Sequence, residues 1–97
     1  MMFRLITSHP IAEDSPDHLY PTGTRNDNSV NQSFNRALMS LYSHKPFVLD
    51  FGCAGGGMVK SFVDMGCISV GLEGSDYNRK HKRATWSDIP GALFTCD

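Results

Sequence analysis

The residues best suited to chemistry surround a glycine-rich stretch in the middle of the chain. Asp50 precedes Gly52, Ala54 and Gly56, so the stretch reads acid-x-Gly-x-Ala-x-Gly. Glycines let a ligand approach the backbone closely, because a Cβ in the loop would hold it away. A second acid, Glu73, follows the first glycine by about twenty residues, the separation at which an acid binds ribose hydroxyls in nucleotide sites. The spacing predicts a site for an adenosine-containing cofactor.

Two strands and a helix are expected to position these residues. Residues 47–51 (FVLDF) are a short apolar run, typical of a central parallel strand that is buried on both faces. Residues 57–65 place their apolar side chains along one side of a helix, and Gly66 ends it. Residues 68–72 form a second strand that leads to Glu73. This order predicts one right-handed crossover unit of a doubly wound α/β sheet.

Further elements are expected on both sides of this unit. A helix over residues 31–43 would cover one face of the sheet, with Phe34 and Leu38 as its buried pair and Leu41 and Tyr42 on the same face. After Glu73, a helix capped by Ser75 or Asp76 would run to about Arg83 or Trp86, and residues 92–96 would form a third strand.

The domain organisation follows from these elements. Residues 1–30 contain Pro10, Pro16, Pro21 and a polar cluster at 24–29, which predicts an irregular segment. Residues 31–97 carry three strands, too few for a doubly wound sheet of ordinary size. We therefore expect a partial domain: the N-terminal half of a Rossmann-like cofactor-binding domain.

Two cofactors fit the glycine loop differently. Read as a dinucleotide fingerprint, the loop is Gly52-x-Ala54-x-x-Gly57, with alanine where a second glycine would admit the pyrophosphate. Read from Asp50, it resembles the first motif of the class I S-adenosylmethionine-dependent methyltransferases, which commonly begins Leu-Asp-x-Gly-Cys and tolerates alanine at its middle position. S-adenosylmethionine carries an ammonium, a sulfonium and a carboxylate. An acid beside the loop therefore favours this cofactor over a dinucleotide, whose pyrophosphate is an anion.

The resemblance covers about residues 31–97 and includes two further motifs. Residues 70–75 (VGLEGS) are similar to the second motif of that family, which implies that Glu73 binds the ribose and that Gly74 passes beside the adenine. Residues 93–97 (LFTCD) are similar to the third motif, which implies that Asp97 reaches the adenine amino group.

The first motif implies the remaining contacts. Backbone atoms of Gly52, Cys53 and Ala54 would contact the methionine end of the cofactor, while Asp50 orders the loop; an acid that only hydrogen-bonds loop amides is the alternative for Asp50. The full set of cofactor-binding residues is Asp50, Gly52, Cys53, Ala54, Gly56, Glu73, Gly74 and Asp97.

The function expected from this resemblance is methyl transfer from S-adenosylmethionine to an acceptor that the sequence does not name. Catalysis would depend on positioning, and no catalytic residue is assigned. Two alternatives stay open: a truncated, non-catalytic binding module, and a fragment of an NAD-type Rossmann oxidoreductase, which Asp50 and Ala54 disfavour.

Composition limits the other classes. Nine Lys and Arg against ten Asp and Glu leave a net charge of -1, so nucleic acid is not an expected partner, and the basic run at 78–83 is interpreted as a solvated helix face. No stretch approaches the roughly 20 apolar residues of a membrane span, which favours a cytoplasmic protein. Cys53, Cys67 and Cys96 lack metal-ligand spacing and are expected to be free and mostly buried. An exposed strand edge would favour self-association.

Overall fold

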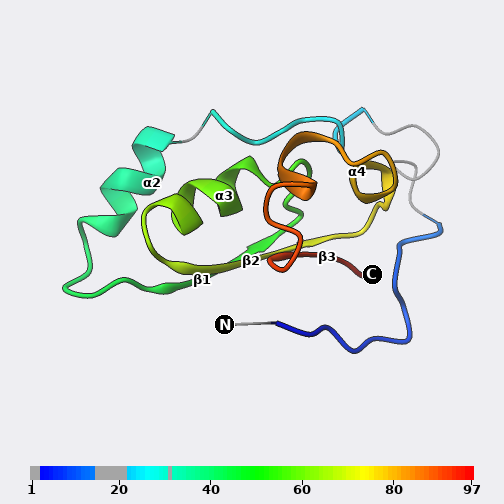
Figure 1. The fold of residues 1–97 in the computed structure, drawn as a ribbon, viewed down its shortest axis with the longest axis horizontal. Helices are drawn as coiled ribbons and strands as arrows, with labels where there is room; N and C mark the ends of the chain where they lie inside the picture. Colours follow the sequence, from blue (N-terminus) through cyan, green and yellow to red (C-terminus); the bar gives the residue numbers. More distant parts are fainter. Residues whose placement is uncertain (1–2, 15–21, 31) are drawn as a thin grey trace.

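A three-stranded parallel sheet forms the centre of the molecule (Figure 1). The computed structural model describes residues 3–14, 22–30 and 32–97. Its strands are β1 (Phe47–Phe51), β2 (Ile68–Glu73) and β3 (Leu93–Thr95), in the order β1-β2-β3. Both pairs are parallel, with Asp50 opposite Gly71 and Leu72 opposite Phe94. The expected α/β class and the three strands are confirmed.

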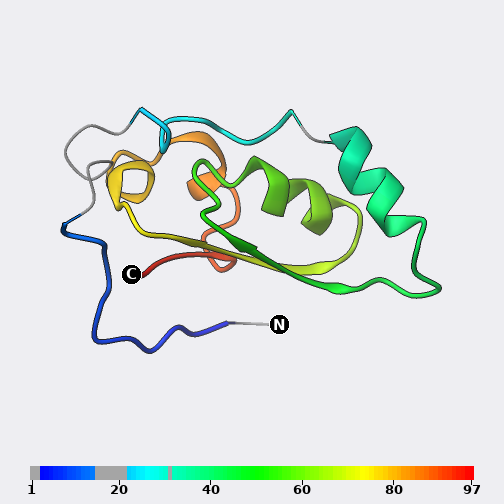
Figure 2. The ribbon, with the colours of Figure 1, turned by 180° about the vertical axis from the view of Figure 1, so that it is seen from behind.

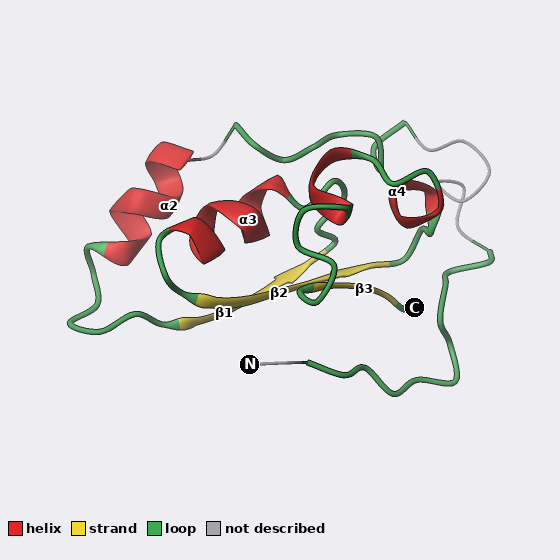
Figure 3. Cartoon of the chain, in the orientation of Figure 1, coloured by secondary structure: helices red, strands yellow, loops and turns green. Residues whose placement is uncertain are grey.

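The apolar sequence of the first strand predicted a central position in the sheet, and this prediction is wrong. The strand pairs with β2 and forms an edge of the sheet, so β2 is the middle strand. Phe47, Leu49 and Phe51 are 60%, 46% and 75% exposed. These three side chains point to one face of the sheet, and the helices that the structure describes lie on the side of the opposite face (Figure 3). An apolar run indicates burial on both faces only where a second layer of structure is present.

Helix α3 (Gly57–Asp64) follows the glycine loop and covers the sheet, close to the predicted bounds. Val59 and Phe62 are fully buried, whereas Lys60 and Asp64 form an ion pair of 2.9 Å on the outer side. Gly66 has a φ of +86°, a backbone conformation that glycine adopts without strain and that often ends a helix. The buried core beneath α3 consists of Cys53, Val59, Trp86 and Leu93.

Helix α2 (Gln32–Met39) is shorter than the predicted helix and buries a different face. Asn35 is its buried residue, whereas Phe34 is 57% exposed and Leu38 is half-buried. The prediction of Phe34 and Leu38 as the buried pair is therefore wrong. The helix packs mainly against α3, so its partner is another helix and not the face of the sheet (Figure 1). The expected first residue of this helix, at position 31, lies outside the described residues.

The single long helix expected after Glu73 is two short elements. One is α4 (Tyr77–Lys80), and the other is the 3-10 helix η1 (Ala84–Trp86). Lys82 and Ala84 each have a φ of +50°, which no continuous right-handed helix contains. The break turns the chain back, so that Trp86 enters the core.

The described parts of residues 1–30 contain neither helix nor strand, as expected; positions 1–2 and 15–21 lie outside the described residues. Residues 3–7 run along the sheet face opposite the helices, which Figure 2 shows from behind. The Phe3 ring meets the Phe47 ring edge-on at 5.8 Å between centroids. Residues 22–29 pass instead over the helical side, above the glycine loop.

Candidate functional site

Two acids lie at the carboxyl ends of neighbouring strands. Asp50 pairs in register with Gly71, and side chains two residues apart on a strand share a face, so Asp50 and Glu73 both point to the helical side of the sheet. Asp50 Oδ2 is buried and has no hydrogen-bond partner among the described residues. Burial, and after it the negative charge of Glu73, raises the pKa of Asp50. The structure therefore contains an unsatisfied acid at the predicted site.

Glu73 has a role that the sequence did not reveal: it holds the glycine loop. Its Oε2 accepts a hydrogen bond of 2.6 Å from the Ala54 N–H, and its Oε1 accepts one of 2.9 Å from the Gly74 N–H. The resemblance assigned the ordering of the loop to Asp50, whereas the described hydrogen bonds assign it to Glu73. The Ser75 N–H also donates to Oε1, at 3.4 Å. A carboxylate has about four lone-pair sites, so Glu73 retains capacity for about one further donor, such as a ribose hydroxyl.

The glycine loop is covered by its own chain. The Gly55 N–H donates to the Asn26 carbonyl at 2.8 Å, and the Gly57 N–H donates to the Asp27 carbonyl at 2.6 Å. The side-chain amide of Asn28 donates to the Cys53 carbonyl at 3.3 Å. The polar cluster at 24–29, which the sequence indicated only as irregular, thus occupies the N–H donors of Gly55 and Gly57 at the start of α3.

The opposite side of the loop is closed by η1. The Trp86 Nε1–H donates to the Ala54 carbonyl at 2.8 Å, and the Thr85 hydroxyl donates to the Gly55 carbonyl at 2.8 Å. Ala54 has a φ of +47°, which an alanine adopts only when its surroundings hold it. The sequence placed Trp86 only at the possible end of a helix; its single N–H, which needs a partner when buried, was the available indication of this role.

Cys53 and Gly56 lie beneath the site rather than in it. Cys53 is fully buried, and burial followed by the charges of Glu73 and Asp50 raises the pKa of its thiol to about 12. A thiol with that pKa is not a nucleophile at neutral pH. A Cβ on Gly56 would approach Thr85 Oγ1 to 2.5 Å, so internal packing already requires this glycine. The cysteines are free, with Cys53 and Cys67 buried, as expected.

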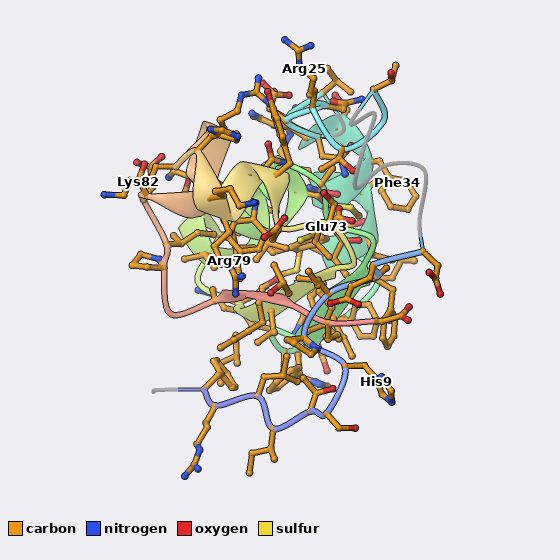
Figure 4. All side chains as sticks on the ribbon, turned by 90° about the vertical axis from the view of Figure 1, so that its right-hand side faces the viewer. His9, Arg25, Phe34, Glu73, Arg79 and Lys82 are labelled. Carbon is orange, nitrogen blue, oxygen red and sulfur yellow. The ribbon has the colours of Figure 1, made fainter. Side chains whose placement is uncertain are left out.

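Gly74 and Asp97, the two positions assigned to the adenine, follow the carboxyl ends of β2 and β3. The Ala12 N–H donates to the Gly74 carbonyl at 2.7 Å, and the Asp97 N–H donates to the His9 carbonyl at 2.8 Å. The side chain of Asp97 is exposed and borders a small cavity of about 180 Å³. Figure 4 looks onto this end of the molecule and shows Glu73 together with the segment that carries His9.

The predicted residues therefore fall into three groups, and the buried Cys53 and Gly56 are the first. Asp50, Gly52, Ala54 and Glu73 meet at the ends of β1 and β2, whereas Gly74 and Asp97 lie at the ends of β2 and β3. Gly52 is exposed, with a φ of +78° and with no atom within 4 Å of the position of a Cβ. A side chain at position 52 would therefore point into open space.

Comparison of the chain with models of protein families, with curated proteins and with solved structures finds no match. Within the part of the chain that the structure describes, no helix is long and apolar enough to cross a membrane. Among the same residues, no three His, Cys, Asp or Glu side chains gather as a metal site.

Proposed function

We propose that the chain binds S-adenosylmethionine at the carboxyl ends of β1 and β2 and acts in methyl transfer. The observation that carries this proposal is the buried Oδ2 of Asp50, which has no partner among the described residues and lies beside a second acid, Glu73. An unpaired buried acid is unfavourable unless a cation or donor satisfies it. The ammonium and sulfonium groups of S-adenosylmethionine are such cations.

The arrangement of the strands supports this site. A doubly wound sheet has the classic strand order 3-2-1-4-5-6, and its ligand lies outside the carboxyl ends, next to the first strand. The order β1-β2-β3 agrees with one half of that sheet. In this assignment Asp50 binds the ammonium, Gly52 admits the ligand, Glu73 binds the ribose, and Gly74 and Asp97 flank the adenine.

The chemistry proposed is an in-line displacement. An electron pair of the acceptor forms a bond to the methyl carbon while the C–S bond breaks toward sulfur, which leaves S-adenosylhomocysteine. The chain contributes by binding and orientation, which lower the entropic part of the barrier.

A second candidate, a non-catalytic module, is favoured by one observation. The loop amides of Gly55 and Gly57 are bonded to the carbonyls of Asn26 and Asp27, so the glycines serve the packing of the chain. The same bonds argue against an NAD-type site, because a pyrophosphate needs those amides as donors.

Calorimetry with S-adenosylhomocysteine and with NAD tests the proposal. We expect binding of S-adenosylhomocysteine only, and we expect Asp50→Asn to weaken it by about tenfold or more, because a hydrogen bond to a charged group contributes about 1.5–3 kcal/mol. Asp88→Asn is the matched control, since Asp88 is an exposed acid outside the site. Binding of NAD alone would refute the proposal, and binding of neither ligand would favour the non-catalytic module.

A further inference from the structure

The N-terminal segment connects the uncovered sheet face to the proposed site. Phe3 packs edge-on against Phe47, and Leu5 lines an apolar groove of about 250 Å³ together with Leu49 and Phe94. From there the segment runs to the end of the sheet at which the C-terminus lies and passes the carboxyl ends of the strands (Figures 1 and 2). One end of the segment is therefore held on apolar surface, away from the site.

The other end, residues 8–12, lies across the ends of β2 and β3. Its two backbone hydrogen bonds join Ala12 to Gly74 at 2.7 Å and His9 to Asp97 at 2.8 Å. A Cβ placed on Gly74 would lie 3.1 Å from the Ala12 Cβ, so the segment contacts this glycine directly. Gly74 and Asp97 are the two positions assigned to the adenine.

We propose that residues 8–12 form a strap that covers the adenosine end of the cofactor site and must detach before the cofactor binds. This inference rests on the proposed function, because it assigns Gly74 and Asp97 to that cofactor. A ligand that binds only the open form shifts the chain toward it, and its apparent affinity is lowered by the fraction of chains that are closed.

The strap is built to open locally. Ser8, His9 and Pro10 are exposed, and Ile11 and Ala12 are only half-buried, so no fully buried side chain has to leave the core when the strap opens. Segments with few buried contacts open at free energies well below that of global unfolding. The anchor at Phe3 and Leu5 keeps the released strap close to its site.

A disulfide lock tests the proposal in the full chain. Ala12→Cys with Gly74→Cys places the two Cβ atoms at 3.1 Å, slightly below the usual 3.5–4.5 Å of a disulfide, so a small shift closes the bond. The background carries Cys96→Ser, because the backbone carbonyl of Cys96 lies 3.8 Å from the same Cβ position and a free thiol on that residue could exchange with the new disulfide. The reduced form of the same variant is the matched control, since it contains the same substitutions.

A release variant gives the opposite arm. Ala12→Pro removes the N–H that donates to Gly74, and Ile6→Ala, at an exposed position of the same segment, is its control. We expect the oxidised lock to lose S-adenosylhomocysteine binding by about tenfold or more relative to its reduced form. We expect Ala12→Pro to bind about fivefold more tightly than the unchanged chain, as follows from the loss of one modest hydrogen bond of the closed state.

The outcomes separate the two proposals. Equal and measurable binding by the oxidised and reduced lock overturns the strap and leaves the cofactor site standing. If Gly74→Cys, which lies at the adenine position, abolishes binding in both forms, Ala12→Pro decides, and its failure to bind more tightly than the unchanged chain overturns the strap. Absence of S-adenosylhomocysteine binding in every form, including Ala12→Pro, overturns both. Hydrogen exchange supplies an independent readout in the unchanged chain: the ligand should speed exchange of the Ala12 and Asp97 amides, and slower exchange of both would contradict the strap even if Ala12→Pro fails to fold.

Discussion

Asp50 combines burial with proximity to a second acid. Its Oδ2 is buried without a partner among the described residues, and Glu73 lies near enough to raise its pKa further after burial. Glu73 differs, because the backbone N–H groups of Ala54, Gly74 and Ser75 donate to its carboxylate. The two acids at the site therefore divide the work: Glu73 holds the loop, and Asp50 is left to face a ligand.

The raised pKa of Asp50 predicts a pH-dependent effect on stability. Since the folded chain binds the proton more tightly than the unfolded chain, stability falls as the pH rises above about 3.8, the value of an unperturbed aspartate, through the folded pKa. Asp50→Asn removes this penalty. We expect Asp50→Asn to be more stable than the unchanged chain at about pH 7, with the difference shrinking toward about pH 4.

Urea unfolding across that pH range measures the effect. Asp88→Asn, at an exposed position, controls for the loss of one negative charge. A difference that stays constant with pH would show that the Asp50 carboxyl is not destabilised by its surroundings.

The glycine loop acts as a junction between elements. Residues 26–28 bind it from one side and η1 from the other, so the loop joins the end of β1 to the start of α3 and to two segments distant in sequence. Close backbone approach, which the glycines were expected to allow to a cofactor, is used here by the chain itself.

Gly55→Ala should therefore lower stability even in the absence of ligand. The new Cβ would lie 2.5 Å from the Asp27 Cα and 2.9 Å from the Ala84 Cβ, which are too close for any real contact. We expect a loss of about 1–3 kcal/mol in the free energy of unfolding, as for other overpacked sites. Denaturant titration measures it, with Gly91→Ala as control, because a Cβ at Gly91 has no atom within 4 Å. Equal effects of the two substitutions would show that residues 22–29 do not press on the loop in solution.

The whole molecule has one covered and one largely uncovered sheet face. Phe47, Leu49 and Phe51 face away from the helices, and alternate residues of β2 continue the same face as Ile68, Val70 and Leu72. The N-terminal segment covers part of this face through Phe3 and Leu5. Apolar surface next to an unpaired strand edge favours association between molecules.

We expect Phe51→Lys to weaken self-association about tenfold, because burial of an exposed phenylalanine contributes about 1.5–3 kcal/mol. Phe51 is 75% exposed on the edge strand, so the substitution should leave folding unchanged. Sedimentation velocity over a range of concentrations measures the effect. Leu41→Lys is the control, because Leu41 is 77% exposed but lies outside the sheet. If the two variants associate alike, the sheet face is not the contact surface.

Local patterns predicted those elements whose burial is set by their own neighbours in sequence. Helix α3 has one apolar side and a terminating glycine, so its existence and its apolar side followed from spacing; Val59 and Phe62 on that side are fully buried, and Met58 and Val63 are half-buried. Helix α2 was predicted to bury Phe34 against the sheet, but it packs against α3, and Asn35 is buried instead. The pattern of a helix states which side is apolar, not which surface that side will meet.

The chain order of strand, glycine loop, helix, strand and acid was readable from residue types, because φ preferences, apolar periodicity and the direction of parallel strands act over short distances. That order alone brought Asp50, the loop and Glu73 to one edge of a sheet. Tertiary packing decided which groups remain free there. Residues 26–28 and η1 occupy loop donors and acceptors, and Ala12 contacts Gly74; each of these contacts joins segments more than 20 residues apart. Hydrogen bonds across such separations depend on how the chain folds back on itself, which no local pattern encodes.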